Sequence, residues 1–252
     1  VTLRVSENAN GRNARDVTVV PVSSDTGLRQ RQWMEDNRKK VDELSGGRLA
    51  YVYLPNTAQA GYTNFNRYYY AQQDKLGAVI DERFNGGGKV ADYIVEFIDR
   101  PLMSMWASRN GRPFTSPNAA IFGPKVMIIN EWAGSGGDYL PWAFKKRGVG
   151  PLIGRRTWGG LIGVSGFPTL MDGAFTTAPS FAIYSTDTQN PQWIVENEGV
   201  APDIEVDVDP QDVAAGRDPQ LERAVAECLR LLEAYPDQLA PRPAPIRRVN
   251  GN

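Results

Sequence analysis

A serine flanked by glycines follows an apolar run in the middle of the chain. Residues 125–130 are Lys-Val-Met-Ile-Ile-Asn, and Ala133-Gly134-Ser135-Gly136-Gly137 comes shortly after them. A helical pattern begins next, so the sequence predicts a strand-to-helix turn that exposes the Ser135 hydroxyl beside free backbone N–H groups. Such a turn is typical of a nucleophilic serine with an oxyanion-binding site. A plain helix N-cap is an equally good interpretation of Ser135, since alanine stands where the G-x-S-x-G pattern has its first glycine.

A run of three glycines, Gly86 to Gly88, comes after a second segment, residues 77–84, that has the pattern of a buried strand. Glycines let the backbone approach a ligand closely and point its N–H groups outward. The sequence has neither the G-x-x-x-x-G-K-[ST] pattern nor a dinucleotide fingerprint, so a phosphate-binding loop is a poor interpretation. Three consecutive glycines cost more chain entropy than a plain turn requires. The run therefore favours a binding site over a simple strand-to-helix connection.

The 252 residues contain no histidine, although histidine is the usual base beside a serine nucleophile. A lysine can replace it, which directs attention to residues 154–161 after the next short apolar run. Several carboxylates lie between residues 195 and 206, Glu196 among them. Because charged loop residues are mostly solvated, their pattern alone does not identify an acid.

Composition limits the classes of function. The chain has 28 basic and 29 acidic residues, a net charge of −1 that gives no electrostatic footprint for nucleic acid. Its single cysteine, Cys228, excludes an internal disulfide framework and a cysteine-based metal cluster. No apolar run is long enough to span a bilayer. The sequence does not begin with methionine, so we expect a fragment or a processed chain.

Apolar runs alternate with helical patterns along most of the chain, which predicts an α/β core with parallel strands. The first 22 residues alternate as a β-hairpin with a turn at Asn10-Gly11. We expect strands at residues 49–54, 77–84, 125–130 and 152–154, and a β region at 167–182. We expect helices at residues 28–44, 65–73, 90–102, 138–146 and 219–234. A Pro-rich tail begins at Pro236.

The motifs occur in an order that resembles the tricorn branch of the tail-specific (C-terminal-processing) serine peptidases. The resemblance covers roughly residues 1–235. It rests on Ser45-Gly46-Gly47-Arg48, Arg83-Phe84-Asn85-Gly86-Gly87-Gly88, Ala133-Gly134-Ser135-Gly136-Gly137-Asp138, Thr157-Trp158-Gly159 and the segment from Val195 to Val206. It implies a Clp-protease/crotonase-like spiral of ββα units. It also implies three parts, with residues 1–24 as the end of a truncated PDZ-like domain, 25–235 as the nucleophile-bearing peptidase domain and 236–252 as a tail.

The same resemblance implies roles for individual residues. Ser135 would be the nucleophile and Glu196 the acid of the charge relay. The N–H groups of Gly136 and Gly88 would form the oxyanion hole. Main-chain contacts to an extended substrate would come from Gly86, Gly87, Gly88, Gly163, Val164 and Ser165. The chain would then be a serine endopeptidase acting on oligopeptides.

The resemblance also implies where the base comes from. The classical tail-specific branch places a lysine at the position occupied here by Gly160, which excludes a serine–lysine mechanism by this motif. The tricorn branch uses a histidine from a domain that precedes the PDZ-like module, and we expect this chain to be inactive without it. Two alternatives stay open, a catalytically inactive peptide-binding module and another crotonase-fold enzyme that stabilises an enolate. The second is weaker, because that class lacks the ordered motifs.

The expected partners are peptide substrates, with no nucleic acid, no membrane, no cofactor and no metal. By resemblance the chain would assemble as a homo-oligomer, a hexamer in tricorn relatives. We expect a cytoplasmic location, with the cell envelope as the alternative. In the tricorn archetype an acidic side chain between the glycine run and the serine reads a basic P1 residue. Residues 105–109 offer no carboxylate there, so we expect an apolar or mixed P1 preference.

Overall fold

The computed structural model describes residues 1–235 and 240–244. They form two compact units, Val1–Asp36 and Asn37–Asn252, and all the buried hydrophobic residues of the described chain except Met34 belong to the second. Most of the predicted Pro-rich tail at residues 236–252 lies outside the described residues. Within the described residues, no helix combines the length and the apolar character needed to cross a membrane.

The first unit contains the predicted hairpin. Strands β1 (Thr2–Val5) and β2 (Arg15–Thr18) pair antiparallel. The predicted turn at Asn10-Gly11 lies in the connection between them, which spans residues 6–14 and is longer than a two-residue hairpin loop. Side chains hold this longer loop: the Ser6 hydroxyl donates to the Arg12 carbonyl at 2.7 Å, and Asn10 Oδ1 accepts from the Arg12 N–H at 3.1 Å. Helix α1 (Thr26–Ser45) follows and continues into the second unit.

A five-stranded parallel sheet forms the centre of the second unit. Its strand order is β11-β8-β7-β4-β3. The strands are β3 (Leu49–Tyr53), β4 (Gly77–Asp81), β7 (Lys125–Ile129), β8 (Leu152–Gly154) and β11 (Ile204–Glu205). Every residue of the first four is buried, as expected for strands covered on both faces. The predicted α/β class with a parallel sheet is therefore confirmed, whereas the ββα spiral and the PDZ-like module stay predictions.

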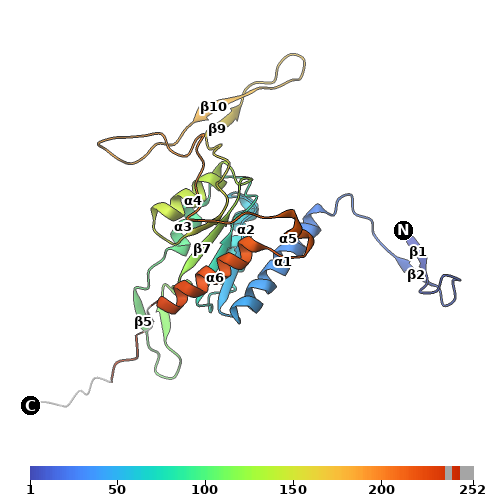
Figure 1. Cartoon of the computed structure of the whole chain (residues 1–252), viewed down its shortest axis with the longest axis horizontal. Coiled ribbons are helices and arrows are strands. Elements are labelled where there is room, and N and C mark those ends of the chain that lie inside the picture. The colour runs from blue at the N-terminus through green and yellow to red at the C-terminus, as the bar shows by residue number, and fades with distance from the viewer. Residues whose placement is uncertain (236–239, 245–252) are drawn as a thin grey trace, which may run out of the picture. The chain divides into compact units, whose positions relative to one another are not determined.

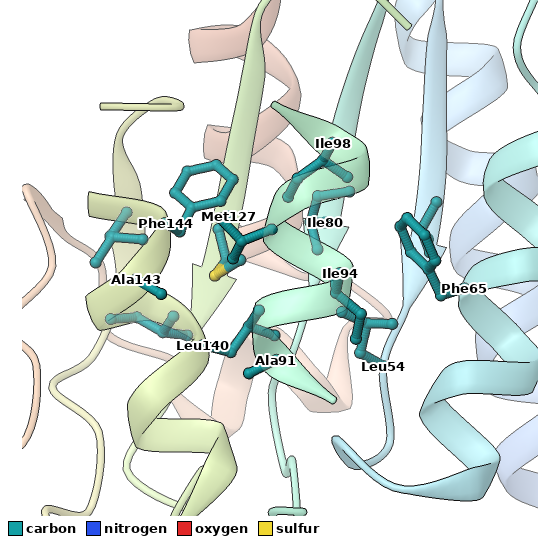
Figure 2. Packing of buried hydrophobic residues seen from close by; sticks show 14 of the residues in the cluster. Leu54, Phe65, Ile80, Ala91, Ile94, Ile98, Met127, Leu140, Ala143 and Phe144 are labelled. Atoms are coloured by element: carbon teal, nitrogen blue, oxygen red, sulfur yellow. The ribbon is translucent and has the colours of Figure 1, made fainter. Parts of the chain in front are cut away.

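Helices cover both faces of this sheet (Figure 1). Helices α2 (Gln59–Tyr70), α3 (Ala91–Ile98) and α4 (Gly136–Lys146) share one apolar core with every second strand residue. Figure 2 shows this core, in which Ile94 and Leu140 lie on neighbouring helices near Ile80 and Met127 of the strands. Helix α6 (Pro219–Ala234) packs against β3, β4, β7 and β8 with a separate buried stripe, and the short α5 (Pro210–Ala214) precedes it.

Two antiparallel hairpins accompany the sheet. Strands β5 (Ser104–Trp106) and β6 (Phe114–Ser116) form one, which the sequence did not predict. Strands β9 (Gly163–Gly166) and β10 (Thr177–Phe181) form the other and correct the predicted β region, which placed its start at residue 167. Figure 1 shows the second hairpin extending away from the helices of its unit. Both consist mostly of exposed residues, so hydrophobic alternation marks their bounds poorly.

Lys125, the first residue of β7, is only 6% exposed, so we expect its charge to affect the free energy of unfolding. Burial lowers its pKa to about 8 from 10.5, an effect that nearby Asp99 partly offsets. Between these two values the unfolded chain binds more protons, so the folded state gains stability as pH rises. We expect Lys125→Met to stabilise the chain at pH 7 by roughly 3 kcal/mol, at about 1.4 kcal/mol per pH unit.

This gain should shrink between pH 8 and pH 10.5, where wild-type Lys125 becomes neutral in both states. Urea unfolding at pH 7 and pH 10 measures the difference. Lys146→Met, at an exposed residue of α4, is the matched control and should change the free energy of unfolding by less than about 0.5 kcal/mol. A gain for Lys125→Met that does not depend on pH would contradict the assignment to the amine.

Candidate active site

Three loops meet at the carboxyl ends of neighbouring parallel strands. The glycine run follows β4, the Ser135 turn follows β7, and residues 157–160 follow β8. Backbone hydrogen bonds join them: Gly134 N–H donates to the Asn85 carbonyl, and Ser135 N–H donates to the Gly160 carbonyl, each at 3.0 Å. The carboxyl edge of a parallel sheet is where α/β proteins place ligand sites. The structure thus brings the two glycine-rich motifs and the serine together.

Ser135 has a backbone conformation that a non-glycine residue rarely adopts, with φ 56° and ψ −118°. It occupies the N-cap position of α4, yet its side chain makes no capping hydrogen bond. The interpretation of Ser135 as a plain N-cap is therefore not supported, since a capping serine uses its oxygen on the first helical turn. Instead, a strained strand-to-helix turn presents a hydroxyl group that the helix does not use.

The glycine run and the Ser135 turn approach so closely that side chains would not fit. A Cβ added to Gly87 would lie 2.6 Å from Ser135 Cβ, and one added to Gly136 would lie 2.3 Å from the Gly88 carbonyl oxygen. The N–H groups of Gly86 and Gly87 are already used, on the Pro55 carbonyl at 3.0 Å and on Asn85 Oδ1 at 2.9 Å.

The N–H groups of Gly88 and Gly136 differ from their neighbours. Neither donates a hydrogen bond to any acceptor in the described part of the chain. They lie side by side, because a Cβ on Gly136 would be 2.7 Å from the Gly88 nitrogen. Two adjacent N–H groups without protein acceptors, next to a serine hydroxyl, have the composition of an oxyanion hole.

Glu196 hydrogen-bonds to the loop beside Ser135 and is linked to Ser135 itself only through that loop. Its Oε2 accepts from the N–H groups of Leu161 at 2.6 Å and Ile162 at 2.7 Å. These residues follow Gly160, whose carbonyl receives the Ser135 N–H. The side chain is half-buried, and Oε1 accepts no hydrogen bond from the described residues. One carboxylate oxygen thus fixes the loop while the other remains available.

Backbone strain gathers around the same residues. Five non-glycine residues of the described chain have positive φ, and four of them lie in the segments that form the site. Besides Ser135, they are Phe84 (φ 63°), Val195 (φ 72°) and Asn197 (φ 63°). A positive φ at a β-branched residue such as Val195 is a genuine outlier. Strain of this kind persists where the surrounding structure over-determines a functional geometry.

Asp138 belongs to the site and was missed by the sequence analysis. It is fully buried in the first turn of α4, and its Oδ1 accepts from the Gly159 N–H at 2.7 Å. Burial raises its pKa, while hydrogen bonds from Thr157 and from the Gly159 N–H oppose that shift. An acidic residue three positions after an N-cap serine resembles a capping box, which is the signal that could have identified it. Asp138 ties the loop after β8 to the helix that begins at Ser135.

The predicted substrate-strand residues lie on β9. Gly163, Val164 and Ser165 pair with β10 on one side, and no described strand pairs with the other side. The ring of Phe181 in β10 covers Gly163, since a Cβ there would lie 1.9 Å from it. Lys89, directly after the glycine run, places its Nζ 5.3 Å from the centre of the same ring. One edge of β9 therefore has no strand partner among the described residues.

These features define an α/β protein with a mostly parallel sheet and a strained serine turn facing glycine backbone N–H groups. The family model described as Peptidase family S41 matches residues 48–206, so the chain belongs to this family. "Tricorn protease homolog 1" of Streptomyces coelicolor is 40% identical over 241 residues, covering 96% of this chain and 22% of that protein. "Tricorn protease" of Thermoplasma acidophilum is 35% identical over 241 residues, again covering 96% of this chain and 22% of that protein.

Structural similarity agrees with this assignment. A structure described as "Crystal structure of the tricorn protease" superposes with a TM-score of 0.82 at 36% identity, covering 88% of this chain and 21% of that one. The resemblance to the tricorn branch inferred from the motifs is thereby confirmed. The chain spans only about a fifth of the length of these relatives.

Proposed function

We propose that the chain carries the nucleophile, the oxyanion hole and the acid of a serine peptidase active site. The observation that carries this proposal is the unused hydroxyl of Ser135, held on a strained turn beside two N–H groups that have no protein acceptor. Membership in Peptidase family S41 and similarity to proteins named tricorn protease support the same reaction. Hydrolysis of peptide bonds in oligopeptides is the activity that these groups fit.

In this proposal the base comes from outside these 252 residues, because they contain no histidine and Gly160 stands where the classical tail-specific branch has its lysine. In the proposed mechanism a histidine from another segment of a longer protein takes the proton of Ser135 Oγ as the hydroxyl attacks the peptide carbonyl. The N–H groups of Gly136 and Gly88 then donate to the developing oxyanion. The histidine returns the proton to the leaving amine. Oε1 of Glu196 would accept a hydrogen bond from the network that holds this histidine in place.

The open edge of β9 offers a place for the substrate backbone. An extended peptide can add to such an edge as a further strand, held by main-chain hydrogen bonds that do not depend on its sequence. Gly163, Val164 and Ser165 would supply these contacts on one side, with Gly86 to Gly88 on the other. The proposed substrates are therefore extended oligopeptides rather than folded proteins.

A catalytically inactive peptide-binding module is the second candidate. The complete absence of histidine from the chain favours it, because the strand edge and the N–H groups bind a peptide without any base. The two candidates differ in one respect that can be measured, the reactivity of the Ser135 hydroxyl.

Covalent labelling with a fluorophosphonate probe tests the proposal. We expect the natural full-length protein that contains this chain to be labelled at Ser135, as mass spectrometry of the modified peptide would establish. Its Ser135→Ala variant should not be labelled, and the 252-residue chain alone should react orders of magnitude more slowly because one member of the triad is missing. Peptide binding by the full-length protein with neither labelling nor cleavage would establish the binding module instead.

A further inference from the structure

A fully buried carboxyl group lies beneath the proposed site and has no part in the mechanism above. Glu82 directly follows β4 and is 0% exposed. Its N–H donates to the Ile128 carbonyl at 3.0 Å, but neither carboxyl oxygen has a hydrogen-bond partner in the described part of the chain. A buried carboxylate without donors is costly, so its state requires an explanation.

Glu82 belongs to a row of buried polar side chains that faces the first turn of α4. A Cβ on Gly136 would lie 2.1 Å from Thr57 Oγ1, and one on Gly137 would lie 3.2 Å from Asn85 Cγ. The next residue, Asp138, is also fully buried, and its charge acts on the Glu82 carboxyl more strongly than that of Asp81. Gly136 and Gly137 thus contact Thr57 and Asn85, and Asp138 follows them on the same turn.

The atoms of this row lack partners in a complementary way. Besides the two Glu82 oxygens, the buried atoms without a partner among described residues are Thr57 Oγ1, Asn85 Nδ2 and Asp138 Oδ2. If Glu82 and Asp138 were both ionised, their carboxylates would offer only acceptors. A single proton on one of them supplies the missing donor, because a protonated carboxyl has one O–H.

The surroundings favour the proton on Glu82. Burial raises its pKa well above 4.5, and the charges of Asp138 and Asp81 raise it further. Asp138 keeps a donor of its own, the Gly159 N–H. Asp81 accepts hydrogen bonds from the Arg83 guanidinium and from the Tyr51 hydroxyl. The same guanidinium also donates to Asp218. Among the described residues, the charges that act on Glu82 are therefore those of two acidic groups.

We propose that Glu82 is a positioning residue that stays protonated at neutral pH and donates a hydrogen bond to Oδ2 of Asp138. This bond would fix the first turn of α4 from below, while the Gly159 N–H fixes Asp138 from the loop after β8. Ser135 and the N–H of Gly136 sit on that turn. The consequence for catalysis rests on the proposed function, whereas the protonation of Glu82 does not.

Infrared spectroscopy of the 252-residue chain tests the protonation directly. A protonated carboxyl has a C=O stretch separate from that of a carboxylate. We expect the folded wild type to show this band at pH 7 and to lose it on unfolding in denaturant. Glu82→Gln, which has the same shape and no charge, should abolish the band, whereas Glu198→Gln at an exposed site should leave it unchanged. A wild-type spectrum without the band at pH 7 would overturn the proposal.

Thermal unfolding gives a second readout. Above pH 4.5 the unfolded chain loses the Glu82 proton while the folded chain keeps it, so this group makes the folded state less stable as pH rises. Glu82→Gln removes that loss. We therefore expect the Tm of Glu82→Gln minus that of wild type to increase steadily from pH 4.5 to pH 7. A difference that is constant over this range would contradict a raised pKa.

Labelling of the full-length protein separates positioning from mere packing. Glu82→Gln retains a donor for Asp138, whereas Glu82→Met removes it, so we expect Met to slow labelling of Ser135 at least ~10-fold more than Gln. Equal rates for the two variants would remove the positioning role. If the infrared band is present but nothing labels Ser135, the proposed function fails and the buried proton stands.

Discussion

Gly88→Ala in the full-length protein is expected to slow fluorophosphonate labelling of Ser135 by at least about 100-fold, and Gly86→Ala by no more than a few-fold. Losing one donor of an oxyanion hole typically costs 10²–10³-fold in rate. Gly88 is the single residue of the glycine run whose N–H lacks an acceptor among the described residues. The two variants therefore carry the same substitution at one glycine whose N–H is free for the oxyanion and at another whose N–H is bound to the Pro55 carbonyl.

The physical reason lies in the space around each residue. Gly88 has φ +142°, a conformation that side chains rarely adopt, and an added Cβ would lie 2.1 Å from the Thr57 carbonyl oxygen. That neighbour is backbone, so either the loop or residue 57 must move, and the N–H of residue 88 moves with it. At Gly86 the nearest atom, the Pro55 carbonyl oxygen, is 4.0 Å away, and no positive φ has to be maintained. Alanine at residue 86 also keeps the same main-chain groups.

Pseudo-first-order labelling rates, measured below the unfolding midpoints of both variants, decide this prediction. Since Gly88→Ala also introduces backbone strain, its Tm should fall as well. Equal labelling rates for Gly88→Ala and wild type would show that another N–H serves the oxyanion. A large loss at Gly86→Ala would mean that the first glycine carries the role assigned here to the third.

Four of the five strands of the central sheet and the serine turn could be predicted from the sequence because their signals are local. Residues 126–129 form a continuous apolar run, as a strand buried on both faces requires, and glycines mark the places where the loops of the site approach each other closely. The helix at residues 219–234 was predicted with the observed bounds from its helical pattern. The structure shows that Asp218 caps it by accepting from the Leu221 N–H, with Pro219 in its first turn. Tertiary contacts are not needed to recognise any of these features.

The buried acids could not be predicted, because only the folded chain brings them together. Asp and Glu residues are seldom fully buried, so Glu82 and Asp138 look like ordinary polar residues in a single sequence. Their burial depends on packing between the end of β4 and the first turn of α4, which lie 56 residues apart by their numbers, 82 and 138. The link from Glu196 to Leu161 and Ile162 likewise needs the loop conformation before the role of the acid becomes visible.

Arg83→Met is expected to lower the free energy of unfolding by about 3–5 kcal/mol, a large part of the 5–15 kcal/mol typical of a folded domain. The Arg83 guanidinium is buried and binds two carboxylates at once: Asp81 Oδ2 at 2.7 Å, and both oxygens of Asp218 at 2.9 Å. These acids lie on β4 and at the N-cap of α6. The arginine therefore fastens the helix to the sheet just before the glycine run.

Removal of Arg83 would leave Asp81 and part of Asp218 buried without their counter-charge, which is why the cost exceeds that of an ordinary ion pair. The matched control is Arg155→Met, which breaks an exposed pair with Asp207 and should cost less than about 1 kcal/mol. Urea unfolding at neutral pH measures both variants. If the two substitutions cost the same, Arg83 is not the fastening that its contacts indicate. If Arg83→Met also slows Ser135 labelling in the full-length protein while it is still folded, the Arg83 contacts also position the glycine run, through the neighbouring residues Glu82 and Asn85.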